Sequence, residues 1–211
     1  MAKFPRFEQQ VAVSPWHDVD PSDGLLPAQF NAIIEIPLGS SNKYELDKET
    51  GMLKLDRVLF TSTHYPANYG FIPRTWADDG DPLDVLVLCS EVIQPLSLVR
   101  CYPIGVITML DQGKLDEKII AIPFSDPMYN MYHDILDLPS HIFDEMAHFF
   151  SVYKDLEPGK SVEGAHWVGR DEALRALAEA AKWTGKWYDA GCNTVYCTYD
   201  KEDSILHDEI A

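Results

Sequence analysis

The feature that most constrains the fold is a succession of short segments, starting at Phe30, in which β-branched or alternating apolar residues are bounded by turn-forming residues. The expected strands are FNAIIEIP from Phe30, then NKYELD, MLKLDRVL, DVLVLC at 84–89, LVRCYPIGVITML at 98–110 and KIIAIP at 118–123. KETG, between the second and third segments, is typical of a hairpin turn. The pattern therefore predicts a mainly β protein with an antiparallel sheet or barrel.

Helical periodicity is confined to the later part of the chain. The first expected helix has Ser140 as its N-cap and an apolar face made of Ile142, Phe143, Met146, Phe149, Phe150 and Tyr153. The second follows Arg170, with Asp171 in the capping position and an apolar stripe made of Leu174, Leu177, Ala178 and Ala181. Both are expected to pack against the sheet.

The chain has no repeat, low-complexity tract or Gly/Ser linker, which favours a single domain. Residues 1–29 contain PWHD (Pro15–Asp18) and the turn-rich DPSDG, and we expect them to form an N-terminal arm laid over that domain. The barrel with its C-terminal helices is expected to span residues 30–186, and residues 187–211 form a polar, acidic extension of unknown role.

The charge balance restricts the partners. The chain carries 34 acidic and 17 basic residues, a formal net charge of −17, which disfavours binding to nucleic acids or anionic membranes. No apolar run approaches the roughly 20 residues of a membrane helix, and the first residues lack the apolar run of a secretory signal. The four cysteines, at 89, 101, 192 and 197, suit reduced thiols. We therefore expect a cytoplasmic protein.

The segment most suggestive of chemistry is ADDGDPLDVL, in which Asp79, Asp81 and Asp84 directly precede an apolar strand. Clustered carboxylates are the ligands that Mg²⁺ and Ca²⁺ prefer. A solvated acidic turn is the alternative for any one of them. An EF-hand is excluded, because a loop starting at Asp79 would have Leu83 and Ser90 at positions that need acidic ligands.

A second acidic pair supports a metal site. Asp111 and Asp116 flank the turn QGKL, and Lys118 lies on the same side of a strand as Asp116. Glu35 interrupts the apolar segment IIEIP, so its carboxylate must either face outward or be paired. Lys43 and Glu45 occupy alternate positions in KYELD.

Basic residues are scarce, so their positions are informative. Arg57 and Lys154, with the hydroxyl of Tyr153, are suited to hold phosphate oxygens, although each alone is equally an ordinary surface residue. Together, the acidic and basic groups suggest a carboxylate-held metal cluster that faces a phosphate site.

These segments, taken in order, resemble the soluble Mg²⁺-dependent inorganic pyrophosphatases of family I, the OB-barrel type. The family's DxDPxD-type motif corresponds to DGDPLD, residues 79–84, and follows YPANYGFIP at 65–73. Upstream stand IEIP (34–37), KYELDKETG (43–51) and DR (56–57), and downstream stand RCYPIGV, the hairpin with Asp111, Asp116 and Lys118, and HFFSVYKDLE (148–157). The resemblance extends from about residue 30 to about residue 180 and implies a five-stranded OB-like antiparallel β-barrel with two packing α-helices.

The resemblance also implies roles for individual residues. The metal ligands correspond to Asp79, Asp84, Asp111 and Asp116, with Glu35 acting through coordinated water. Asp81 corresponds to the acceptor of the proton from the attacking water, and Tyr69 to a hydroxyl beside nucleophile and substrate. The positions that hold phosphate oxygens are those of Lys43, Arg57, Lys118, Tyr153 and Lys154, and the further pocket-lining positions are Glu45 and Tyr65.

The implied reaction is hydrolysis of pyrophosphate, supplied as its Mg²⁺ complex, to two orthophosphates by in-line attack of a metal-activated water, with several Mg²⁺ ions in each site. The implied assembly is a homo-oligomer, with a hexamer favoured over a dimer. The main alternative is a divalent-cation-binding OB-type module without catalysis. A nucleic-acid-binding OB module is disfavoured, because it would need a basic groove with stacking aromatic residues.

Overall fold

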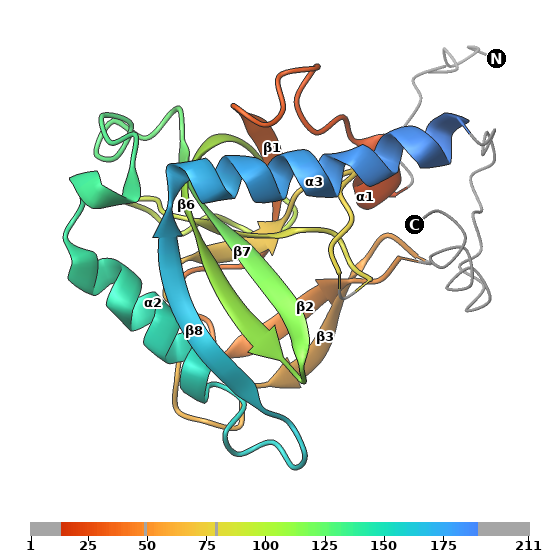
Figure 1. Cartoon of the computed structure of the whole chain (residues 1–211). Coiled ribbons are helices and arrows are strands. Elements are labelled where there is room, and N and C mark those ends of the chain that lie inside the picture. Colours follow the sequence, from red (N-terminus) through yellow and green to blue (C-terminus); the bar gives the residue numbers. More distant parts are fainter. Residues whose placement is uncertain (1–13, 49, 79, 190–211) are drawn as a thin grey trace, which may run out of the picture.

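The computed structural model describes residues 14–48, 50–78 and 80–189, the last seven of these by their backbone alone. The chain forms a twisted β structure with α2 (Ser140–Val152) on one side and α3 (Arg170–Asp189) across one end of the strands (Figure 1). No helix in these ranges combines the length and the apolar character that crossing a membrane requires.

Five strands pair in a closed circuit. They are β1 (Phe30–Ile36), β4 (Asn68–Phe71), β5 (Asp84–Val87), β7 (Lys114–Pro123) and β6 (Leu98–Asp111), paired in that order. The circuit closes because the first residues of β6 also pair with β1, for example Phe30 with Cys101. The predicted five-stranded barrel with two packing helices is thereby confirmed. Its pairings are antiparallel except for β5 and β7, which run parallel, a detail that the sequence pattern did not indicate.

Two strands were missing from the expected set. β4 is only four residues long, and β8 (Val162–Gly169) pairs antiparallel with the second half of β6 outside the closed circuit. β8 is largely exposed or half-buried along its length and contains Gly164 and Gly169, so it lacks a continuous apolar face. The expected strand at 118–123 begins earlier, at Lys114, because the hairpin after Asp111 is paired to its tip.

The expected hairpin forms a separate two-stranded sheet. β2 (Asn42–Leu46) pairs antiparallel with β3 (Leu53–Val58), and Lys43 lies opposite Arg57. Because the two strands are short and only partly buried, their placement depends on contacts with the barrel rather than on their own pairing.

Both predicted helices exist, with two corrections. The N-cap of α2 is Pro139, and Ser140 is the first helical residue and makes no capping hydrogen bond. Its predicted apolar face is otherwise buried, apart from the partly buried Ile142. In α3, Asp171 lies within the first turn, and the buried face consists of Ala173, Ala176, Leu177 and Ala180. That face is displaced by one residue from the expected stripe, because small alanine side chains let the helix lie close to the sheet. Of the four residues of the expected stripe, only Leu177 is fully buried.

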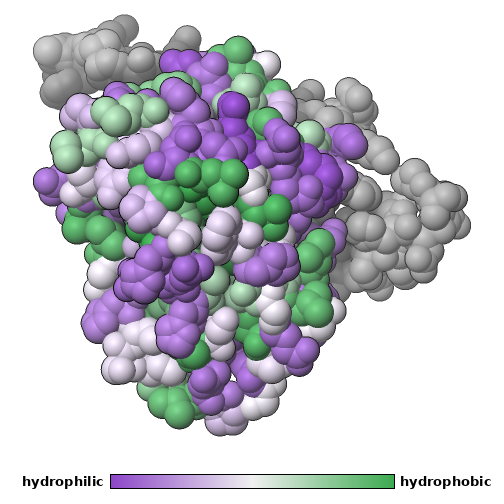
Figure 2. All heavy atoms as spheres, turned by 60° about the vertical axis from the view of Figure 1, so that its left-hand side comes forward, coloured by the Kyte–Doolittle hydropathy of each residue, from purple (hydrophilic) through white to green (hydrophobic). Residues whose placement is uncertain are grey.

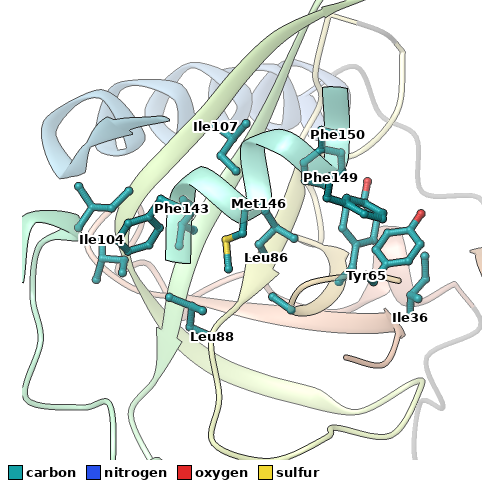
Figure 3. Close-up of a cluster of buried hydrophobic side chains, with 14 of the residues drawn as sticks. Ile36, Tyr65, Leu86, Leu88, Ile104, Ile107, Phe143, Met146, Phe149 and Phe150 are labelled. Atoms are coloured by element: carbon teal, nitrogen blue, oxygen red, sulfur yellow. The ribbon is translucent and has the colours of Figure 1, made fainter. Parts of the chain in front are cut away.

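The barrel strands are apolar on both faces, and the two larger of the three core clusters lie on opposite faces of these strands. Leu86 and Ile120 pack with α2, whereas their neighbours Val85 and Ile119 belong to the cluster that contacts α3. Side chains alternate between the faces of a strand, which explains this division. Figure 3 shows the first of these clusters, where residues of α2 lie against residues of several strands.

The surface mixes polar and apolar side chains. On the face that Figure 2 shows, hydrophobic areas are separated by hydrophilic side chains and do not form one continuous apolar surface.

The predicted boundary between residues 186 and 187 falls within α3, whose backbone continues to Asp189, and residues 190–211 lie outside the described ranges. The division into arm, barrel and extension therefore stays a prediction.

Gly70 lies where strands β1 and β4 approach each other closely, and replacing it tests how much this close packing contributes to stability. A Cβ atom at this position would lie 1.9 Å from the carbonyl oxygen of Ile33, a backbone atom that cannot move aside without disturbing the β1–β4 pairing. We expect Gly70→Ala to lower the free energy of unfolding by roughly 3 kcal/mol or more, measured by urea denaturation. Gly169→Ala is the matched control, because its Cβ would have no neighbour nearer than 4.0 Å. Equal stability of the two variants would contradict the prediction.

Candidate active site

The centre of the candidate site is a buried lysine held by two carboxylates. Register places Asp84 on β5 directly beside Lys118 on β7, and Asp116 lies two residues earlier on the same side of β7. The Nζ atom of Lys118 lies 2.6 Å from Oδ2 of Asp84 and 2.9 Å from Oδ1 of Asp116. Burial alone would lower the pKa of Lys118, but the two carboxylates raise it well above its usual value. The lysine is therefore charged in the folded protein.

Two tyrosines extend this centre. The hydroxyl of Tyr69, on β4, donates a hydrogen bond to Asp84 and lies 3.3 Å from Nζ of Lys118. Tyr65 packs beside it, with ring centroids 5.3 Å apart, and also contacts the ring of Phe149 on α2. Burial raises the pKa of both tyrosines well above the usual value, so both hydroxyls stay protonated and available as donors.

The end of α2 supplies the next two groups. Tyr153 is the C-cap residue of the helix, and Lys154 follows it directly. Lys154 forms an ion pair with Asp111, the last residue of β6, and both side chains are largely buried. Burial raises the pKa of Tyr153, and Lys118, Asp111 and Asp116 are near enough to affect it electrostatically. Residues from β6, β7 and α2 therefore converge on one place.

The β2–β3 hairpin contributes a second basic pair. Lys43 forms an ion pair with Glu45 and lies 3.5 Å from Asp56. Opposite it, Arg57 pairs with Asp56, and its Nε atom donates a 2.8 Å hydrogen bond to Oε1 of Glu157. An open cleft of about 320 Å³, lined by Glu45, Leu46, Asp47, Lys48 and Lys54, lies along the same hairpin.

Glu35 is paired rather than outward-facing. It is buried in β1, and its Oε1 atom accepts a 2.6 Å hydrogen bond from the backbone N–H of Leu46 on β2. Burial raises the pKa of Glu35 to about 8, and the neighbouring carboxylates of Asp84 and Glu45 act in the same direction. Its carboxyl group thus links the barrel to the hairpin and lies near Asp84.

Two predicted residues of the DGDPLD motif are not among the contacts of this cluster described above. The side chain of Asp81 is exposed and forms an ion pair with Lys48. Lys48 was not among the predicted site residues. Asp79 lies outside the described residues. Within the described ranges, no three acidic, histidine or cysteine side chains form a ready metal cage, because Lys118 and Lys154 occupy the carboxylates of Asp84, Asp116 and Asp111.

Two buried polar atoms without hydrogen-bond partners indicate which kinds of ligand the site could bind. Nη2 of Arg57 and Oδ1 of Asp111 are buried and have no hydrogen-bond partner among the described residues. An unsatisfied guanidinium N–H fits a phosphate oxygen, and an unsatisfied carboxylate oxygen fits a divalent cation. The donor set therefore fits an anionic phosphate compound together with a hard cation.

Two residues with structural roles at the site were not among those predicted from the sequence. Glu157 is buried and orients Arg57, and Lys48 pairs with Asp81. Glu157 stands in KDLE, immediately after the selected Tyr153 and Lys154, but a carboxylate beside a surface-like turn gives no signal that it is buried. Lys48 lies at the start of the KETG turn, where a lysine is ordinary.

Comparison with known proteins gives a consistent result. Residues 32–184 match the family described as "Inorganic pyrophosphatase". The chain is 53% identical over 154 residues to "Inorganic pyrophosphatase" of Streptomyces coelicolor, covering 73% of this chain and 94% of that protein. It is 47% identical over 170 residues to "Soluble inorganic pyrophosphatase" of Oryza sativa subsp. japonica, covering 81% and 78%. The crystal structure of inorganic pyrophosphatase from Thermus thermophilus matches with a TM-score of 0.75 at 39% identity, covering 79% of this chain and 97% of that one.

The buried carboxyl of Glu35 makes the metal-free fold sensitive to pH. Its pKa is about 8 in the folded state against an ordinary value of 4.5, so the folded state keeps a proton that the unfolded state loses between these values. Stability of the protein in EDTA should therefore fall as the pH rises through this window. Glu35→Gln removes this titration, and we expect its stability relative to wild type to increase by on the order of 4 kcal/mol between pH 5 and pH 8. Parallel pH curves from denaturant titrations would refute this.

Proposed function

This chain belongs to the inorganic pyrophosphatase family, and on that premise we propose that it hydrolyses pyrophosphate to two orthophosphates by direct in-line attack of water, with Mg²⁺ as its cofactor. The observation that carries the proposal is the buried set of Lys118, Asp84 and Asp116, next to the unsatisfied atoms of Arg57 and Asp111. This set combines cation ligands and phosphate donors in one place.

The metal-holding residues we propose are carboxylates: Asp79, Asp84, Asp111, Asp116 and, through water, Glu35. Oxygen ligands of this kind suit Mg²⁺, and so many of them suit several ions. When bound, such ions neutralise phosphoryl oxygens and lower the pKa of a coordinated water. In the described structure, Asp84 and Asp116 accept from Lys118 and Asp111 pairs with Lys154, so a bound cation would share these carboxylates with the two lysines or displace them.

The phosphate-holding residues we propose are Lys43, Arg57, Lys118, Tyr153 and Lys154. Arg57 is fixed by Glu157 through Nε, and its Nη2 atom has no acceptor among the described residues. A guanidinium held in this way is oriented before substrate arrives, so less conformational entropy is lost on binding. The neutral hydroxyls of Tyr69 and Tyr153 add donors without adding charge. Tyr65 and Glu45 are the further pocket-lining residues that we propose.

Asp81 is the proposed proton acceptor. Its side chain is 59% exposed, more than those of Asp84 and Asp116, so a water molecule can reach its carboxylate. The attacking water loses its proton to Asp81 as its oxygen bonds to phosphorus. The bond from that phosphorus to the bridging oxygen breaks, and the leaving phosphate is neutralised by Arg57 and Lys154.

The substrate, assembly and compartment are further parts of the proposal. We expect pyrophosphate to bind as its Mg²⁺ complex and the protein to form a homo-oligomer, with a hexamer favoured over a dimer. Exposed apolar side chains between β7 and α2, among them Met128, Met131 and Leu136, support an interface between copies. Cys89 and Cys101 are free thiols, which is compatible with the cytoplasm.

One assay separates this function from the alternative of a cation-binding module without catalysis. We expect the protein to release phosphate from pyrophosphate with Mg²⁺, to release none in EDTA, and to turn over poorly with Ca²⁺, whose longer and looser coordination positions the reactants less well. Phosphate release is measured colorimetrically. Tight Ca²⁺ binding without Mg²⁺-dependent release would favour the module and exclude the enzyme.

The role of Asp81 is tested by its amide variant. Asp81→Asn preserves size and exposure but removes the proton acceptor, so we expect kcat to fall about 100-fold or more while the fold is retained. Steady-state kinetics with Mg²⁺ measure the loss, and circular dichroism checks the fold. Asp171→Asn, on the exposed first turn of α3, is the control for removal of one negative charge. Near wild-type turnover in Asp81→Asn would rule out the proposed role.

A further inference from the structure

The first described part of the N-terminal arm, residues 14–20, is attached to the segment that precedes the catalytic carboxylates. Its single-turn helix α1 (Pro15–Asp18) buries Trp16, which is 3% exposed. The Trp16 ring stacks on the ring of Trp76, with centroids 5.7 Å apart and planes 6° from parallel. Trp76 lies five residues before Asp81, so this contact holds the base of the segment that carries it.

Hydrogen bonds fix the arm at the same point. Nε1 of Trp16 donates to the carbonyl oxygen of Thr75 at 3.1 Å, and the N–H of Arg74 donates to the carbonyl oxygen of Trp16 at 2.9 Å. The buried hydroxyl of Thr75 in turn accepts a 2.9 Å hydrogen bond from the N–H of Leu83. The arm thus contacts one end of the segment directly and the other end through Thr75.

A third connection leads from Trp16 to the Asp81 side chain. Nζ of Lys48 lies 4.6 Å from the centroid of the Trp16 ring, within the range of a cation–π interaction, and forms an ion pair with Asp81. The side chains of Lys48 and Asp81 are 44% and 59% exposed, so packing alone does not fix the ion pair. The aromatic face is a rigid platform that restricts where the ammonium group lies.

We propose that Trp16 is a positioning residue for the reaction: through Trp76 and Lys48 it holds Asp81 where the attacking water must lose its proton. This inference rests on the proposed function, in which Asp81 accepts that proton. A displaced base slows the chemical step without weakening the contacts that bind phosphate, because those come from other elements of the site. The arm is thereby a working part of the active site, although none of its residues was selected for chemistry.

The first test compares two substitutions of Trp16. Trp16→Ala removes the ring, and we expect kcat for Mg²⁺-pyrophosphate to fall about tenfold with KM changed less than about twofold. Trp16→Phe keeps an aromatic face for Trp76 and Lys48 but loses the hydrogen bond to Thr75, and we expect it to recover most of kcat. An unchanged kcat in Trp16→Ala, or equal losses in both variants, would overturn the proposal.

The second test addresses the ion pair. Lys48→Gln removes the charge that connects Trp16 to Asp81, and we expect it to lower kcat in the same direction as Trp16→Ala. Lys182→Gln is the matched control, because Lys182 is an exposed residue of α3, is not among the residues that line the cleft, and undergoes the same charge change. Equal kinetics of the two lysine variants would contradict the inference. These variants keep it testable even if Trp16→Ala folds poorly.

The third test needs neither metal nor activity. Hydrogen exchange in EDTA, read by mass spectrometry, should show faster exchange in peptides spanning residues 72–86 of Trp16→Ala, and unchanged exchange in peptides from β6 and β7. Faster exchange throughout the chain would mean a general loss of stability and would overturn the positioning role. If wild type releases no phosphate with Mg²⁺, the proposed function fails, whereas the exchange result still reports independently whether the arm restrains this segment.

Discussion

The structure depends on one buried interaction, the charged group of Lys118 between the carboxylates of Asp84 and Asp116. Burying a lysine is costly unless its charge is compensated, and two carboxylates on neighbouring strands provide that compensation. They can do so only because β5 and β7 are parallel and in a register that sets Asp84 beside Lys118. The strand pairing and the chemistry therefore constrain each other. A slip of one residue would turn these charges into the apolar face of the barrel.

The closed circuit of strands explains how groups that are distant in sequence share one site. Closure fixes β6 between β1 and β7, and α2 is then held against the strands by the cluster that Figure 3 shows. The end of α2 brings Tyr153 and Lys154 to Asp111 at the end of β6. The hairpin joins the same place through Glu35 and Arg57. Strands supply Asp84, Asp116 and Lys118, and Lys154 directly follows the end of α2, an arrangement that suits a reaction that needs positioning and neutralisation of charge.

Much of the fold could be predicted from alternation and turn residues, but the errors have physical causes. Strand β8 was missed because its residues face solvent in part and carry no apolar stripe. The α3 face was misplaced because Ala173 and Ala176 are weak signals in a helix rich in alanine.

The candidate site residues were chosen by their motifs, and six of them do lie together: Asp84, Asp111, Asp116, Lys118, Tyr153 and Lys154. Three features of the site depend on tertiary contacts and could not be predicted from the sequence. Glu35 accepts a hydrogen bond from the Leu46 backbone, and Glu157 is buried against Arg57. Lys48 connects Trp16 to Asp81.

The hydrogen bond between Arg57 and Glu157 spans 100 residues of sequence. Loop closure over such a distance is entropically unfavourable until the intervening strands have folded, so this contact belongs to the late steps of folding. During synthesis, the barrel strands emerge well before the residues that complete the phosphate side of the pocket. A nascent chain that has made only its first 150 residues thus carries most of the acidic groups but not the group that orients Arg57. Binding of substrate as in the native protein therefore requires that the chain has been made at least as far as Glu157 and that this contact has formed.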